Sequence, residues 1–285
     1  MIKLSNGHSF EYMSASGALG FDGNGWPWEQ PLKLLGVFDP TLFTSVIKTL
    51  TIWPIKGHPL AVRLIPDGVV NAVGLANKGI EWWCKKIGPT INSQKIPLVG
   101  SIFGEPKELA EMTLMLNDFD LVGLEINVSC PNTNTDILQN TKKIIDSCQV
   151  VREKSRLPLI LKVSVIHDAK LIVKELGNSV EAFSINSVPW EIVFSNTSSP
   201  LVSLDGGGVS GKVIQPYTWE LVRKIVEITN VPVIGPSVWD FDDLEKVRNF
   251  GAKAISFGSI FLRYPWRPTL FVKKDKKLKR IRTAT

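Results

Sequence analysis

The chain has 285 residues, of which 44% are hydrophobic and 21% charged, and its formal net charge is +6. This length and apolar fraction provide the core of one large α/β domain or two smaller ones, and they exclude an intrinsically disordered protein. No uninterrupted apolar run reaches the roughly 18 residues of a transmembrane helix, and the first residues lack the apolar centre of a signal peptide. We therefore expect a soluble, cytoplasmic protein without a membrane partner.

The first part of the chain alternates short apolar runs with loops. A strand is expected at 10–14, and it runs into Ala15, Ser16 and Gly17, small residues that let a flat ligand approach the backbone. A loop at 20–31 follows, and a second buried strand is expected at 42–51. Its Lys48 lies in an apolar setting near the strand end, where an amine needs an anionic or polar partner.

The same alternation continues to the C-terminal region. A β-rich segment at 59–70 leads into a loop with two amides at 71–77, and a glycine loop is expected at 205–211. Further strands are expected at 97–103, 122–128, 157–164, 181–187, 231–237 and 254–259, and helices at 79–86, 105–116, 136–156, 168–176, 215–229 and 241–250.

Strands that alternate with helix-length connections indicate a parallel sheet. About eight strands in roughly 250 residues, without a linker-like change in composition, predict a single-domain (β/α)8 TIM barrel. We place the barrel at residues 1–265 and a basic C-terminal tail at 266–285. A solvated, partly disordered tail is preferred to a patch for an acidic protein, nucleic acid or membrane, because no aromatic residues are interleaved with the charges at 273–282 and no nucleic-acid motif is recognisable.

The stretch Leu124–Asn132 places reactive groups directly after a buried strand. Pro131 has no N–H and cannot continue the ladder, so Asn127, Cys130 and Asn132 should lie at the C-terminal end of the strand. That end is where α/β barrels carry their sites. The two remaining cysteines, at 84 and 148, are not at metal spacing, and neither a disulfide framework nor a metal site is expected.

The C-terminal strand ends of a barrel face one another, so Lys48, a second strand lysine at Lys162, several amides and one thiol should share a cavity. Glu125 lies inside its strand and is expected to point away. Without paired carboxylates or a ligand cluster, glycoside hydrolysis and metal-assisted hydrolysis are disfavoured. No histidine lies beside Cys130 in the sequence, so a Cys–His nucleophilic pair is unsupported. Glycines at 206–211, 235 and 258 favour a phosphate-bearing cofactor.

The motif Asn127-Val-Ser-Cys-Pro-Asn132 resembles the signature of the dihydroorotate dehydrogenases, and the loop at 71–77 resembles that family's substrate-binding loop. Further motifs resemble those of the family in the same order and at similar spacings. They are Ala15-Ser16-Gly17, Val46 to Thr49, Leu161-Lys162, Ile185 to Ser187 and Gly207 to Gly211, and the resemblance covers about Phe10 to Leu262.

This resemblance implies an FMN-dependent oxidoreductase of the soluble, cysteine-base class, which oxidises (S)-dihydroorotate to orotate in pyrimidine and UMP biosynthesis. Cys130 would take the C5 proton while hydride leaves C6 for flavin N5, with Lys48 near both rings. The implied substrate contacts are Lys48, Asn71, Val73, Gly74, Leu75, Asn127, Asn132, Asn186 and Ser187. The implied cofactor contacts are Ala15, Ser16, Lys48, Thr49, Asn127, Lys162, Gly208, Gly211, Gly235, Ser237, Gly258 and Ser259.

Two segments depart from the family pattern. At 234–238 the family has a Gly-Gly pair that donates N–H groups to the FMN phosphate, whereas Pro236 has none to donate. The segment 133–136 lacks the glycines of a mobile lid. A related flavin barrel acting on another reduced pyrimidine, or a non-catalytic barrel subunit that has lost its grip on flavin, therefore stay as alternatives.

The resemblance also bears on partners. It implies a homodimer, and an electron acceptor that is either fumarate or NAD, the latter through a partner subunit carrying FAD and an iron–sulfur cluster. No nucleic acid is expected.

Overall fold

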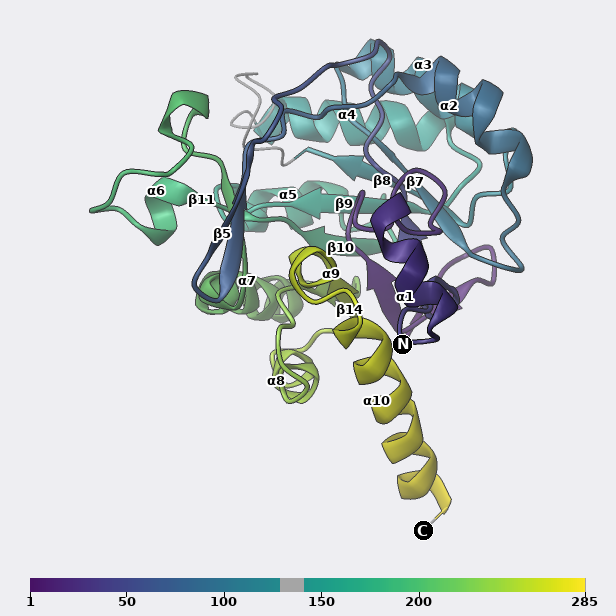
Figure 1. Cartoon of the computed structure of the whole chain (residues 1–285). Coiled ribbons are helices and arrows are strands. Elements are labelled where there is room, and N and C mark those ends of the chain that lie inside the picture. Colours follow the sequence, from purple (N-terminus) through teal and green to yellow (C-terminus); the bar gives the residue numbers. More distant parts are fainter. Residues whose placement is uncertain (129–140, 285) are drawn as a thin grey trace.

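The computed structural model describes residues 1–128 and 141–284. Eight parallel strands close into a barrel in the order β10-β13-β14-β3-β4-β7-β8-β9, and helices surround it (Figure 1). The predicted (β/α)8 barrel is confirmed. The barrel strands are β3 (Tyr12–Ser14), β4 (Thr44–Val46), β7 (Leu98–Ile102), β8 (Gly123–Asn127), β9 (Leu159–Val163), β10 (Ala182–Ile185), β13 (Val233–Gly235) and β14 (Ala254–Phe257).

The larger helices pack outside the barrel, where they cover the outward apolar side chains of the strands. The helices are α1 (Gln30–Leu34), α2 (Ile80–Lys86), α3 (Pro106–Leu116), α4 (Thr141–Lys154), α5 (Ala169–Leu176), α6 (Trp190–Val193), α7 (Gln215–Ile228), α8 (Asp243–Asn249), α9 (Ser259–Arg263) and α10 (Arg267–Ala284). Short 3-10 turns lie at Pro27–Glu29, Pro40–Leu42, Gly88–Thr90, Val202–Leu204 and Lys212–Ile214. Among residues 1–128 and 141–284, no helix is both long and apolar enough to cross a bilayer.

A hairpin of β1 (Ile2–Lys3) and β2 (Ser9–Phe10) packs on the interior of the barrel. Ile2 and Phe10 join Met13, Val99 and Ile160 in one buried apolar cluster. This cluster fills the barrel below the strand ends that carry polar groups, so the hairpin closes the opposite end of the barrel. The expected strand at 10–14 is thus divided between β2, which pairs in this hairpin, and β3 of the barrel.

A second, antiparallel sheet stands beside the mouth of the barrel in the order β11-β12-β6-β5. It comprises β5 (Val62–Ile65), β6 (Gly68–Asn71), β11 (Val188–Pro189) and β12 (Gly208–Gly211). The expectation of a glycine loop over all of 205–211 is wrong, because Gly208–Gly211 pairs with β6, with Gly208 opposite Asn71. This sheet carries the segment at 71–77 to the cavity.

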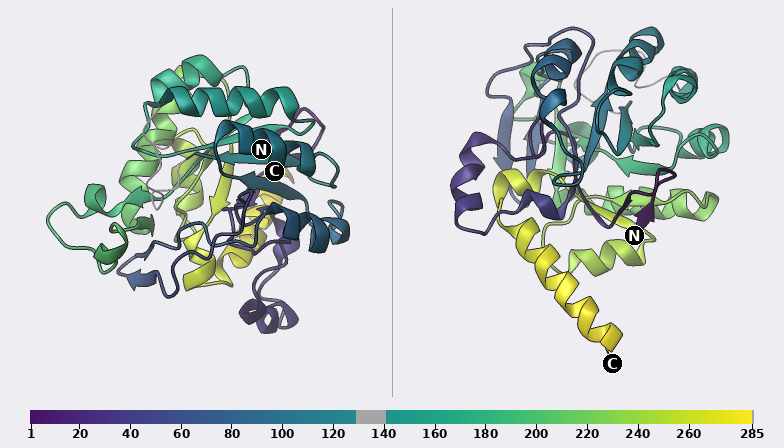
Figure 2. Two further views of the ribbon diagram at one scale, coloured as in Figure 1. Left: turned by 90° about the horizontal axis from the view of Figure 1, so that it is seen from above. Right: turned by 90° about the vertical axis from the view of Figure 1, so that its right-hand side faces the viewer.

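The C-terminal segment is a helix, α10, and not the partly disordered tail that we expected. Figures 1 and 2 show it projecting from the body of the molecule. Asp275 fixes it, because this carboxylate accepts hydrogen bonds from Tyr12 and, at 2.6 Å, from Arg248. Burial alone would raise the pKa of Asp275, but these hydrogen bonds outweigh it and hold the pKa at about 2.

Candidate functional site

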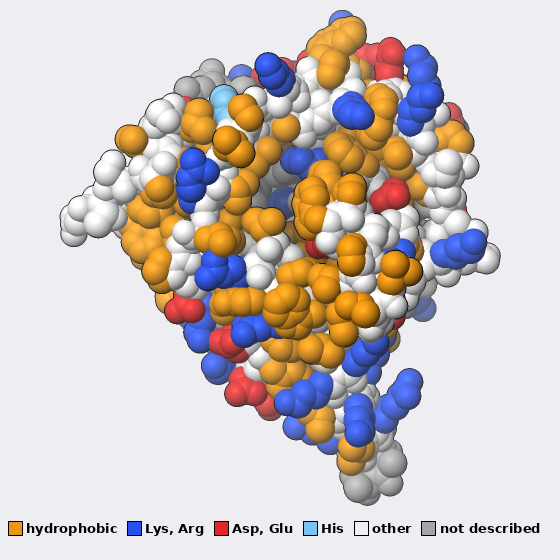
Figure 3. Space-filling view, viewed as in Figure 1, with side chains coloured by type: hydrophobic (Ala, Val, Ile, Leu, Met, Phe, Trp, Pro, Cys, Tyr) orange, Lys and Arg blue, Asp and Glu red, His pale blue; other side chains and the backbone are white. Residues whose placement is uncertain are grey.

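A cavity of about 520 Å³ opens at the C-terminal ends of the barrel strands. Figure 3 shows its mouth as a hollow in which basic side chains are visible. Most of the predicted site residues line it. They are Ala15, Ser16, Lys48, Asn71, Val73, Lys162, Asn186, Ser187, Gly211, Ser237, Gly258 and Ser259. The predicted segments therefore converge on one cavity, and the role of each residue stays a prediction.

The two lysines reach the cavity from different strands. Lys48 follows β4, and Lys162 lies on β9. Gly17 makes room for the first, since a Cβ atom added there would lie 2.7 Å from Cδ of Lys48. Gly17 also has a φ of +74°, a backbone conformation that glycine adopts without strain. The cavity thus receives a lysine side chain from each of two segments.

Glu125 points into the barrel, and the expectation that it points away is wrong. Its carboxylate lies 3.6 Å from Nζ of Lys162 and accepts hydrogen bonds from Ser184 at 2.9 Å and Ser101 at 3.3 Å. Both partners of the ion pair are buried. Because a buried charge is costly unless it is paired and hydrogen-bonded, Glu125 fixes Lys162 at the floor of the cavity.

A chain of hydroxyl groups continues from this ion pair across the barrel. Thr49 lies 2.9 Å from the hydroxyl of Ser101 and 2.8 Å from that of Ser16, and Asn127 donates to Thr49 at 3.1 Å. Thr49 and Asn127 are buried behind the cavity wall. Thr49 and Asn127, both predicted to contact the cofactor, therefore bond to each other, and Thr49 also bonds to Ser16.

The predicted substrate amides come from two segments. Asn71 ends β6, and its Nδ2 donates to the carbonyl of Gly208 at 3.4 Å. Asn186 and Ser187 follow β10. Val73 lines the cavity, whereas Gly74 and Leu75 are absent from the described lining, and Leu75 packs on Phe103 instead.

The loop after β13 is held by contacts within the protein. The carbonyl of Pro236 accepts a hydrogen bond from the indole of Trp219 at 2.9 Å, and that of Ser237 accepts one from Gln215 at 2.8 Å. Ser237 has a φ of +67°, in the left-handed region that favours glycine. Gly235 faces outward, since an added Cβ would lie 2.4 Å from Val247 on α8.

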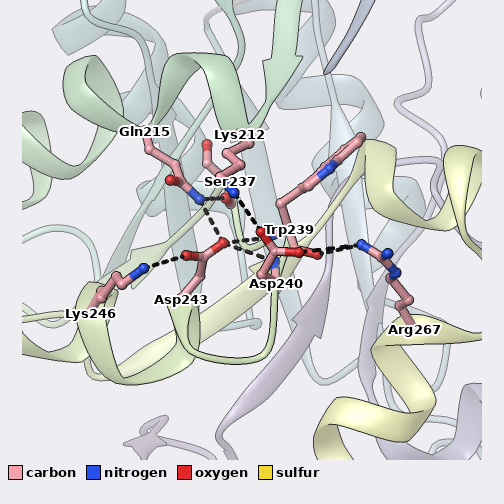
Figure 4. A network of polar contacts seen from close by, with 8 residues as sticks. All are labelled: Lys212, Gln215, Ser237, Trp239, Asp240, Asp243, Lys246 and Arg267. Carbon is pink, nitrogen blue, oxygen red and sulfur yellow. Dashed lines mark hydrogen bonds and ion pairs between the residues drawn. The ribbon is translucent and has the colours of Figure 1, made fainter. Parts of the chain in front are cut away.

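Figure 4 shows the polar network behind this loop. The carboxylate of Asp243 is buried and accepts from the backbone N–H groups of Trp239 and Asp240, at 3.0 and 2.9 Å, and from Gln215. Asp240 in turn pairs with Lys212 at 2.7 Å and Arg267 at 3.4 Å. The loop keeps its shape through these contacts.

Three side chains at the mouth were missed by the sequence reasoning, which treated 20–31 only as a loop. Trp26 and Trp28 stack with ring centroids 5.2 Å apart, and both line the cavity with Glu29. The Glu29 carboxylate is buried and accepts from the Trp26 N–H at 2.7 Å. Burial raises the pKa of Glu29 to about 7. The sequence signal was two tryptophans and an acid in a glycine-rich loop.

Some of the predicted residues are not found at the cavity. Cys130 and Asn132 fall outside the described residues, while Gly208 lies in β12 without lining the cavity. Cys148 is buried, and burial raises the pKa of the Cys84 thiol to about 11. No cluster of three potential metal ligands occurs in residues 1–128 and 141–284.

Comparison with known proteins identifies this arrangement. The family model for dihydroorotate dehydrogenase matches residues 15–263. The chain belongs to the dihydroorotate dehydrogenase family. Members of this family are oxidoreductases and in general use a flavin.

Two relatives illustrate the similarity. A protein of Desulforudis audaxviator is 31% identical over 263 residues, covering 89% of this chain and 83% of the relative. One from Carboxydothermus hydrogenoformans is 31% identical over 264 residues, covering 87% and 81%. Each is named dihydroorotate dehydrogenase B (NAD(+)), catalytic subunit.

Proposed function

We propose that this chain is an FMN-dependent catalytic subunit that oxidises (S)-dihydroorotate to orotate and passes the electrons to an electron-transfer subunit. The observation that carries the proposal is the convergence of Lys48, Lys162 and the amides Asn71 and Asn186 on one cavity in a member of this family. The names of the relatives support the partner subunit and NAD as the final acceptor. In this proposal the catalytic subunit forms a homodimer.

The described residues fit a flat, anionic cofactor. Lys162 presents a fixed positive charge beside the hydroxyl groups of the floor, and Ala15 and Gly258 offer little side-chain bulk. In the proposal Lys162 contacts the ring, and Ser237, Gly258 and Ser259 lie at the phosphate. When bound, the flavin supplies a two-electron acceptor.

The substrate would bind between Lys48 and the amides. Each amide offers a donor and an acceptor, which suits the imide edge of a planar pyrimidine ring. Lys48 would stabilise the carboxylate or ring charge of the substrate. Cys130, at its sequence position after β8, would remove the C5 proton as a thiolate.

An absorption spectrum of the purified chain, followed by anaerobic addition of dihydroorotate, tests the proposal. We expect flavin bands that bleach with dihydroorotate. A Cys130→Ser variant should keep the bands and lose at least about a hundredfold in bleaching rate near neutral pH, since a hydroxyl is a much weaker base. Cys84→Ser, at a half-buried thiol outside the cavity, is the matched control.

Three outcomes would contradict the proposal. A colourless chain that binds no added FMN would favour the non-catalytic barrel. Bleaching by another reduced ring but not by dihydroorotate would favour the related oxidoreductase. Full activity of the Cys130→Ser variant would remove Cys130 from its role as the base.

A further inference from the structure

Helix α10 has one side fixed to the barrel. Val272 and Thr269 are fully buried, and Asp275 bonds to Tyr12 and Arg248. The Lys279 ammonium pairs with Glu11 near the start of the chain. These contacts define which face of α10 is turned toward the protein and which is turned toward its surroundings.

The opposite side of α10 carries an apolar stripe. Trp266, immediately before the helix, and Leu270, Leu278 and Ile281 within it are between 39% and 53% exposed. At 3.6 residues per turn, spacings of 4, 12 and 15 residues from Trp266 place all four on one side. Large apolar side chains in such a row are a sign of an interaction surface.

Basic side chains run along the edge of this stripe. Lys273, Lys276, Lys277 and Arg280 are exposed and share one surface hollow with Ile281. Over its whole length α10 has eight lysine and arginine residues and a single acidic residue, Asp275. Since Asp275 is turned inward, the exposed face is strongly positive.

We infer that α10 docks on the surface of an anionic lipid bilayer, with its axis in the plane of the membrane. An apolar row with tryptophan at one end suits the boundary between headgroups and acyl chains. The lysines can lay their methylene stems along this boundary and hold their amines among anionic headgroups.

Other occupants fit the same face less well. A second copy would bring two strongly positive helices together, and like charges repel. Nucleic acid would use the lysines but leave the leucine and isoleucine side chains exposed to water. The lipid surface satisfies both the charge and the apolar row.

The orientation has a consequence for the cavity. Figure 3 shows the mouth of the cavity, the apolar patch below it and the basic side chains of α10 on one face of the molecule. Leu262 lines the cavity and is half exposed, and Trp266 lies just beyond it in the chain. Docking through α10 therefore turns the mouth of the cavity toward the membrane.

Co-sedimentation of the full chain with vesicles tests the inference independently of enzymatic activity. We expect binding to phosphatidylcholine vesicles that contain phosphatidylserine, a loss of binding as salt is raised, and little binding to phosphatidylcholine alone. Combined charge reversal, Lys273→Glu with Lys277→Glu, and combined Leu278→Glu with Ile281→Glu should each weaken binding at least tenfold.

Matched controls separate α10 from the rest of the surface. Lys107→Glu with Lys170→Glu changes the same charge elsewhere, and Leu114→Glu with Leu171→Glu changes exposed leucines on α3 and α5. Both control variants should bind vesicles as the unchanged chain does. Circular dichroism of all four double variants verifies that they fold. Absence of vesicle binding, equal losses in the controls, or α10 variants that lose self-association instead of lipid affinity would overturn the inference.

Discussion

The floor of the cavity and the loop after β13 are built in opposite ways. On the floor, Lys162 and Glu125 from neighbouring strands bury two charges that depend on each other and on hydroxyl groups of other strands. In the loop, Pro236 and Ser237 turn their carbonyl groups to Trp219 and Gln215 on α7. The register of the barrel strands thus determines how the charges of the floor meet. The conformation of the loop depends instead on hydrogen bonds to α7.

This difference indicates where substitutions should matter. Removing only one of the two charges on the floor should destabilise the protein, because the remaining charge would stay buried without its partner. The loop can change its residues while its anchors, Gln215 and Asp243, keep its path. We expect this to be why a departure from the family pattern, Pro236, occurs in the loop and not on the floor.

The largest effect should come from breaking the floor pair. Glu125→Gln leaves the Lys162 ammonium without its counter-charge and should lower the free energy of unfolding by about 3 kcal/mol. Urea denaturation without added flavin measures it. Lys162→Met alone should cost a similar amount, whereas the double variant should recover much of the loss. Strictly additive losses would show that the two side chains are not coupled.

An effect of intermediate size is expected at Glu29, at the mouth of the cavity. Its buried carboxyl group accepts its hydrogen bond from a backbone N–H and not from a basic side chain. Its pKa is raised from 4.5 to about 7, so between these values the folded state holds a proton that the unfolded state has released. Stability should therefore fall as pH rises from 4.5 through 7. The loss should be about 2 kcal/mol, less than the full shift implies, because the mouth is open to solvent.

Urea midpoints measured at several pH values between 5 and 8 test this dependence. A Glu29→Gln variant should remove most of the change across the range, since the amide does not titrate there. An unchanged slope in that variant would assign the pH dependence to other groups.

The smallest expected effect is in the loop. Pro236→Ala restores a backbone N–H, and if the flavin phosphate lies there, FMN should bind about tenfold more tightly, or about 1.4 kcal/mol. Fluorescence titration of flavin measures it. Pro236→Gly restores the same N–H but adds backbone freedom, so it should gain less. Equal affinity in all three chains would place the phosphate away from residue 236.

The sequence predicted the barrel because apolar strands ending in polar residues are a local pattern, and most of the site residues that the family resemblance implied line the cavity. It failed on Glu125 because both faces of a parallel strand are covered, so burial alone does not tell inside from outside. The signal was nevertheless present. Asn127 was expected to face the cavity, and residues two apart on a strand share a face.

Two other misses have different causes. β12 was taken for a loop because glycines are poor strand formers, and its partner β6 lies far away in sequence. In α10 the density of charge obscured the fact that lysine, arginine and leucine are all good helix formers. In both segments a long-range partner, β6 or the Tyr12 and Arg248 pair, decides the conformation.

The pairing of β6 with β12 has a consequence for how the protein is made. Asn71 and Gly208 are 137 residues apart in the chain. During synthesis, β6 must wait beside β5 with one edge unpaired until β12 has left the ribosome, and exposed strand edges invite wrong pairing. The wall that carries Asn71 therefore cannot form before β12 has been made, and chains that stop before residue 208 should aggregate through this edge.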